Sequence, residues 1–129
     1  MGAERLLKQY FEKRKDIILA FLFGSQAKER ARKESDFDIA IWPASGMSMD
    51  EINKVWSELE DLLRSSVDLI ILNTARPTIA WAALRGKPLL IRDKKLFIKA
   101  MLRISDEAED MQDFAIDLFR LRQKLRGAQ

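Results

Sequence analysis

The 129-residue sequence contains neither cysteine nor histidine. Without cysteine it can form no disulfide and no thiolate metal site, which agrees with a cytoplasmic protein. Without histidine it can form no Ser-His-Asp triad, no histidine general base and no histidine-ligated zinc site. Any catalysis by this chain must therefore use carboxylates, lysine, arginine, hydroxyl groups and the backbone.

Long apolar segments are missing as well. No run approaches the roughly 20 residues that a membrane-spanning helix needs, and the first residues lack the apolar stretch of a secretory signal. Hydrophobic residues make up 47% of the chain and charged residues 33%, as in a folded globular protein. The net charge is only +3, with both signs interleaved, so nucleic-acid binding is not indicated. We expect a single cytoplasmic domain over residues 1–129 that does not associate with membranes.

Strand and helix patterns alternate along the chain. Short apolar runs bounded by turn residues predict strands, and apolar residues three or four positions apart predict helices. The expected strands cover residues 17–23, 37–42, 67–72 and 88–91, the last of them an edge strand because it contains proline. The expected helices cover residues 4–14, 25–32, a segment that begins at the capping-box residue Ser48, a segment that begins near Pro77, and 93–126.

These elements predict an α/β (α+β) fold. We expect a small mixed sheet of about four strands, because several connections are too short for parallel crossovers, with helices flanking it. The core should span about residues 17–92, and the long C-terminal helix about residues 93–126.

The most informative segment is FLFGSQAKERARKESDFDIAIW, which begins at Phe21. Gly24-Ser25 ends one expected strand, and Asp36 and Asp38 stand two residues apart at the start of the next. Because side chains alternate along a strand, both carboxylates should project from the same side of the sheet. Neighbouring carboxylates repel each other unless a cation lies between them, and Mg²⁺ binds one or two carboxylates together with substrate phosphates. The segment therefore points to phosphoryl chemistry.

A third acid, Asp68, lies in another apolar run, where a buried charge would be costly without a partner such as a metal ion. If this run pairs with residues 37–42, three carboxylates converge, and a pair of metal ions could activate an attacking oxygen and stabilise the leaving one. Gly24 would let the backbone approach phosphates or adopt a positive φ. Ser25 would offer a hydroxyl and an N–H at a helix start.

This pattern resembles the signature of the DNA polymerase beta-like nucleotidyltransferase superfamily: a Gly-Ser turn, about ten residues, Asp-x-Asp, and a third Asp on a later strand. In size and in the form GSQAKERARKESDFDIAIW, the chain is most similar to the minimal nucleotidyltransferase (MNT) domains, including the MntA-type antitoxins of HEPN/MNT systems. The resemblance implies that Gly24 and Ser25 contact phosphates. It also implies that Asp36, Asp38 and Asp68 are the catalytic, metal-binding acids.

The same resemblance implies a two-metal Mg²⁺ site, ATP as substrate and a HEPN-type toxin as partner in a hetero-oligomer. It implies that the chain transfers AMP to a tyrosine hydroxyl of the toxin and so acts as an antitoxin. The sequence departs from the family pattern at Glu29, where the family often has glycine. A bulkier acidic residue near bound phosphates would reduce activity, unless the local helix simply continues through it.

Two alternatives use the same sequence differently. A non-catalytic antitoxin would neutralise its partner by direct contact, with the long C-terminal helix as the docking surface. An aminoglycoside-type transferase would act on a small molecule and need no protein partner. Each motif also has a plain structural explanation, because Asp-x-Asp and Gly-Ser occur at ordinary strand edges and turns, and Asp68 can cap a neighbouring turn.

Overall fold

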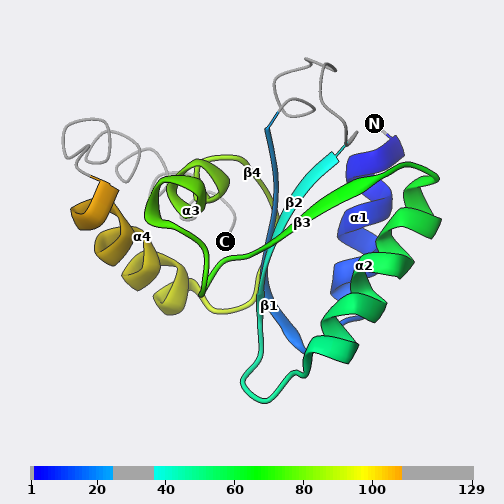
Figure 1. Ribbon diagram of the computed structural model, residues 1–129, viewed down its shortest axis with the longest axis horizontal. Helices are drawn as coiled ribbons and strands as arrows, with labels where there is room; N and C mark the ends of the chain where they lie inside the picture. The colour runs from blue at the N-terminus through cyan, green and yellow to red at the C-terminus, as the bar shows by residue number, and fades with distance from the viewer. Residues whose placement is uncertain (1, 25–36, 109–129) are drawn as a thin grey trace.

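The computed structural model describes residues 2–24 and 37–108 (Figure 1). The expected order of helices and strands is confirmed within these ranges. The elements are α1 (Gly2–Glu12), β1 (Ile17–Phe23), β2 (Phe37–Pro43), α2 (Met49–Leu63), β3 (Val67–Ile71), α3 (Pro77–Leu84), β4 (Lys87–Ile91) and α4 (Lys94–Ala108). The helix expected at 25–32 and the part of the C-terminal helix beyond residue 108 lie outside the described residues.

The four described strands form one mixed sheet in the order β3-β2-β1-β4. Strand β1 runs antiparallel to both β2 and β4, whereas β2 and β3 are parallel. The expected mixed sheet is therefore confirmed, and β4 lies at an edge, where its Pro88 is tolerated. The central position of β1 explains its continuous apolar sequence, because both of its faces are covered.

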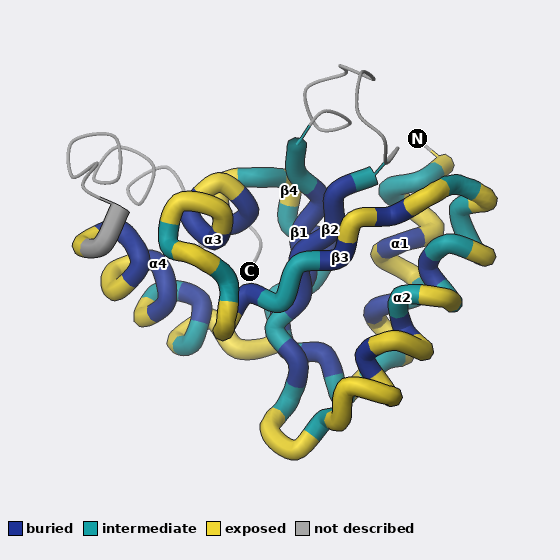
Figure 2. The backbone as a smooth tube through the Cα atoms, viewed as in Figure 1, coloured by how far each residue is buried: buried dark blue, intermediate teal, exposed yellow. Residues whose placement is uncertain are grey.

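Helices cover both faces of the sheet (Figure 1). Helices α1 and α2 pack on one face and α3 and α4 on the other, and each pair closes an apolar cluster against the strands. Residues of β2 alternate between them: Ile39 and Ile41 belong to the α1/α2 cluster, and Ala40 belongs to the α3/α4 cluster. Figure 2 shows the buried residues concentrated in β1, β2 and the inner sides of the helices.

Local capping signals set the helix boundaries. At the start of α2, the Glu51 N–H donates to Ser48 Oγ at 3.2 Å, and the Ser48 N–H donates to Glu51 Oε1 at 2.8 Å. This reciprocal pair is the predicted capping box. Helix α2 ends at Arg64 in a left-handed conformation, with φ of 52°, and Pro77 stands in the first turn of α3 as predicted.

Helix α4 buries the side predicted by its apolar spacing. Phe97, Met101 and Ile104 are all buried against the sheet or α3. The helix begins after Asp93, whose Oδ1 accepts the Leu96 N–H at 3.0 Å. None of the described helices is long and apolar enough to cross a membrane.

Tyr10 joins α1 to α2. Its hydroxyl donates to Glu58 Oε1 at 2.7 Å, and Arg14 lies 3.6 Å from the same carboxylate. Burial, and then the hydrogen bond to Glu58, raise the pKa of Tyr10 well above its ordinary value. The only tyrosine of the chain is therefore held as a neutral phenol on the α1/α2 side of the sheet.

Arg92 ties the end of β4 to the end of α1. Its Nη2 donates to the carbonyl oxygens of Phe11 at 2.8 Å, Glu12 at 3.0 Å and Arg14 at 3.2 Å. Its Nε donates to the Ile17 carbonyl at 3.0 Å. The last carbonyls of a helix lack intrahelical partners, and the helix dipole favours a cation there. One guanidinium therefore anchors α1 to two strands of the sheet.

We expect Arg92→Met to lower the free energy of unfolding by about 1–3 kcal/mol, the range for hydrogen bonds to charged groups. Urea denaturation followed by circular dichroism measures the change. Arg103→Met is the matched control, because Arg103 is exposed on α4 and makes no hydrogen bond or ion pair among the described residues. Equal stability of the two variants would contradict the anchoring role of Arg92.

Candidate active site

Two acids meet where β2 and β3 begin. Asp38 pairs directly with Asp68 in the parallel ladder, and Phe23 at the end of β1 pairs with Asp38 on the other side. Directly paired residues of a sheet point to the same face, which here is the face covered by α3 and α4, since Ala40 and Ile70 belong to that cluster. The expected adjacency of the two acid-bearing strands is confirmed. Asp36 and Ser25 lie outside the described residues.

The two paired acids differ in burial. Asp38 is 2% exposed, whereas Asp68 is exposed. Asp68 therefore avoids the cost of burial that a charge in this apolar run could carry, because β3 is an edge strand and its buried apolar residues, Val67 and Leu69, face the α1/α2 cluster instead. The costly buried carboxylate is Asp38, which lies on a central strand and needs a cation or hydrogen-bond donors to compensate its desolvation.

Gly24 provides the space in which the Asp38 carboxylate lies. A Cβ at this position would overlap Asp38 Oδ2 and would lie 2.8 Å from its Cγ. Gly24 also has φ of +79°, a conformation that side chains disfavour. The turn thus uses the positive φ that glycine permits at this position. The structure adds a second reason for glycine, because the end of β1 packs directly against the acid of β2.

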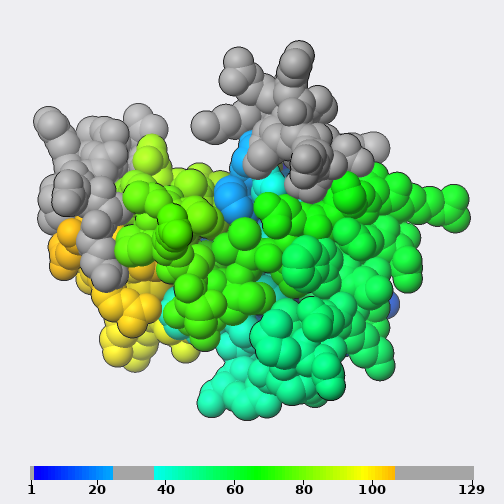
Figure 3. Space-filling view, viewed as in Figure 1, coloured from blue at the N-terminus to red at the C-terminus, as the bar shows by residue number. Residues whose placement is uncertain are grey.

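The turn between α3 and β4 packs closely on the same strand end. A Cβ on Gly86 would lie 2.5 Å from the Leu22 carbonyl oxygen and 2.8 Å from Phe23 Cβ. The C-terminus of α3 therefore lies at the acid-bearing end of the sheet, and it carries Arg85, whose Cζ is 5.4 Å from the centre of the Trp81 ring. In Figure 3 the blue and cyan atoms of the β1 and β2 ends are visible between α3 and β3.

Sequence reasoning did not identify Arg85 as part of this region. The available signal was Gly86, which was predicted only as the point where the helix stops. Trp81 is 5% exposed and belongs to the core, as expected for a periodic aromatic residue.

The donor chemistry of the acid pair fits a hard divalent cation. Carboxylate oxygens are preferred ligands of Mg²⁺, and the chain contains no histidine or cysteine that would favour a softer metal. Over residues 2–24 and 37–108, no group of three or more acids is close enough to hold a metal ion. The third acid of the predicted set, Asp36, falls in the gap between these ranges.

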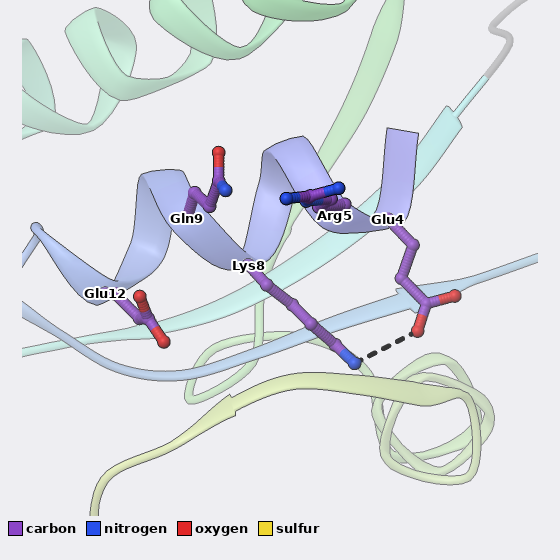
Figure 4. A pocket seen from close by; sticks show the side chains of 5 residues that line it. All are labelled: Glu4, Arg5, Lys8, Gln9 and Glu12. Carbon is purple, nitrogen blue, oxygen red and sulfur yellow. Dashed lines mark ion pairs between the residues drawn. The ribbon is translucent and has the colours of Figure 1, made fainter. Parts of the chain in front are cut away.

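A separate hollow of about 330 Å³ lies on the surface of α1 (Figure 4). Its charges are mixed and partly satisfied, since Lys8 Nζ lies 3.2 Å from Glu4 Oε2. It belongs to the helix layer on the face opposite the acid pair. The hollow is lined by Glu4, Arg5, Lys8, Gln9 and Glu12.

Residues 5–96 match the family model described as "Polymerase beta, Nucleotidyltransferase". A candidate protein adenylyltransferase of Methanocaldococcus jannaschii is 32% identical over 60 residues, which are 46% of this chain and 64% of the relative. The chain thus spans less than two thirds of the length of this curated relative.

Solved structures share the fold. One chain of a toxin–antitoxin crystal structure with AMP-PNP aligns with a TM-score of 0.65 at 23% identity, over 92% of this chain and 99% of its own length. One chain of the complex between the tri-AMPylated Shewanella oneidensis HEPN toxin and its MNT antitoxin aligns with a TM-score of 0.59 at 23% identity, over 90% and 98%. At these identities the likeness establishes a common fold.

We expect Gly24→Ala to destabilise the protein more than Gly46→Ala does. Both glycines have positive φ, but a Cβ on Gly46 would meet no atom within 4 Å. Gly46→Ala should therefore cost only backbone strain, about 1–2 kcal/mol. Gly24→Ala should cost roughly 1–3 kcal/mol more, because the methyl group displaces the Asp38 carboxylate.

Urea denaturation measures both losses, and a double-mutant cycle with Asp38→Ala identifies their origin. The excess cost of Gly24→Ala should shrink in the Asp38→Ala background. Equal losses for the two glycine variants would contradict the close contact between Gly24 and Asp38.

Proposed function

Because the chain belongs to the polymerase beta nucleotidyltransferase family, we propose that it transfers AMP from ATP to a tyrosine hydroxyl of a HEPN-type toxin and releases pyrophosphate. The chain acts in this proposal as a cytoplasmic antitoxin, a single domain in a hetero-oligomer with the toxin. The observation that carries the proposal is the direct pairing of Asp38 with Asp68 beside Gly24.

Each acid and the Gly24-Ser25 turn have a separate role in the proposed reaction. Asp38 and Asp36 hold the cations, and bound Mg²⁺ would neutralise charge on the triphosphate as the bond to pyrophosphate breaks. Asp68 orients the acceptor hydroxyl and takes its proton. The backbone of Gly24, together with Ser25, contacts the phosphates. The proton of the hydroxyl thus passes to a carboxylate while its oxygen forms the new bond to the α-phosphorus.

The burial of the two described acids suits these roles. Asp38, at 2% exposure on a central strand, is held rigidly, as a cation ligand must be. Asp68 is exposed on the edge strand, where an incoming acceptor can reach it. The pair therefore combines a fixed ligand with an accessible base.

The position of Tyr10 supports an acceptor on another molecule. Tyr10 is the only tyrosine of the chain and packs on the α1/α2 face, opposite the acid pair. Its raised pKa also makes it a poor nucleophile. A tyrosine acceptor must then come from a partner, and the toxin–antitoxin complexes of similar fold, one of them containing an AMPylated HEPN toxin, support a partner of that kind.

We expect Asp38→Asn to abolish transfer and Asp68→Asn to slow it by about 10²–10⁴-fold, the contribution typical of a general base. The assay combines the chain, a HEPN-type toxin protein, Mg²⁺ and ATP, and intact mass spectrometry counts the adenylyl groups added. Asp61→Asn is the control, because Asp61 is an exposed acid on α2.

The alternatives give different results in the same assay. If the chain is a non-catalytic antitoxin, its Asp38→Asn variant would still inhibit the partner fully, and the mass of the partner would not increase. A small-molecule transferase would consume ATP with an aminoglycoside and leave the protein partner unmodified. Undiminished transfer by the Asp38→Asn variant would contradict the proposed function.

A further inference from the structure

The start of β3 is held by two side chains of α2. Trp56 Nε1 donates to the Val67 carbonyl oxygen at 2.7 Å, and the Val67 N–H donates to Glu60 Oε2 at 3.0 Å. Val67 directly precedes Asp68 and pairs with Phe37 in the ladder. Both polar backbone groups of the residue next to the acid are therefore fixed by α2 side chains.

This arrangement matters because β3 is an edge strand that pairs only with β2. The first bond at this end of the ladder, from the Phe37 N–H to the Ser66 carbonyl, is long at 3.3 Å. Strand ends with few bonds open locally at low cost. The α2 side chains supply bonds on the side of β3 that no strand covers, so the chain at Val67 is held from both sides.

Helix α2 is a rigid support for the two side chains. Trp56 and Glu60 are four residues apart, which places them on the same side of the helix. The Glu60 carbonyl also accepts the N–H groups of Arg64 and, at 3.4 Å, of Ser65, so the same residue closes the helix end and holds the next strand. The connection between α2 and β3 is thereby fixed along its short length.

Solvent reaches this contact from outside. A shallow hollow on the surface of α2 is lined by Asn53, Trp56, Ser57 and Glu60. Water can therefore bond to the Val67 N–H if the Glu60 carboxylate is removed, which limits the loss of stability. A water molecule does not fix the position of a strand, however. Loss of the Glu60 carboxylate should therefore displace Asp68 without unfolding the protein.

We infer that Trp56 and Glu60 are positioning residues for nucleotidyl transfer, which hold Asp68 opposite Asp38 through the backbone of Val67. The inference rests on the proposed function, in which Asp68 orients the acceptor. Neither side chain belongs to the face that carries the acids, because their contacts lie at the edge of β3 and on α2. They act through the strand and not on the substrate.

The test compares Glu60→Ala, Glu60→Gln and Trp56→Phe with the wild-type chain and with Asn53→Ala, a control in the same hollow. Transfer to the HEPN-type partner should fall about 10-fold to 100-fold in kcat for Glu60→Ala, because small misplacements of reacting groups carry penalties of this order. The KM for ATP should stay unchanged, since the phosphate contacts are elsewhere. Glu60→Gln should retain most activity, because its amide oxygen still accepts the Val67 N–H.

Amide hydrogen exchange in the nucleotide-free chain gives a second readout that needs no activity. In Glu60→Ala and Trp56→Phe the amide of Asp68, which faces β2 in the ladder, should exchange faster than in the wild type, while those of β1 and β4 stay the same. Glu60→Gln and Asn53→Ala should match the wild type. A cooperative unfolding transition in urea for each variant would confirm that all of them remain folded.

Faster exchange at Asp68 with undiminished transfer in Glu60→Ala would overturn the positioning role. An equal loss of activity in Glu60→Gln and Glu60→Ala would also overturn it, because the hydrogen bond is then not what matters. A wild-type chain that transfers nothing to its partner would instead overturn the proposed function, and the positioning role with it.

Discussion

The parallel pairing of β2 with β3 is the constraint on which the rest of the structure depends. It is the single parallel pair among the described strands, and it places Asp38 directly opposite Asp68. A shift of one residue in this register would turn Asp68 into the apolar cluster beneath α1 and α2, where a lone charge is costly. The long connection through α2 helps to hold β3 in this register. The capping box fixes the start of the helix, and the contacts of Glu60 fix its end to the start of β3.

The sheet separates a rigid part of the candidate site from an accessible part. The central strands β1 and β2 carry Gly24 and the buried Asp38, which pack so closely that no side chain fits between them. The edge strand carries the exposed Asp68 and is steadied from outside by α2. This division suits nucleotidyl transfer, in which the nucleotide must be held in one geometry while different molecules approach from the open side.

Local features were predictable from sequence because their signals are local. The capping box at Ser48, the proline at the start of α3 and the apolar run of β1 all appear in the structure as expected. The exposure of Asp68 could not be predicted from the sequence, since an apolar run does not reveal that its strand lies at an edge with its apolar side chains on the opposite face. The bonds of Arg92 and Glu60 to distant backbone groups were missed, because contacts between a side chain and a remote carbonyl or N–H leave no periodic pattern.

The most direct test of the central claim is a crystal structure of the chain with AMP-PNP and Mn²⁺, in which anomalous scattering locates the metal. The acid pair predicts a metal peak about 2.1 Å from an Asp38 carboxylate oxygen, near the distance for small octahedral cations. It also predicts that the phosphates lie against the backbone of Gly24 and that Asp68 faces the α-phosphate. A nucleotide and metal bound elsewhere on the molecule, with the Asp38 carboxylate free of both, would contradict the account.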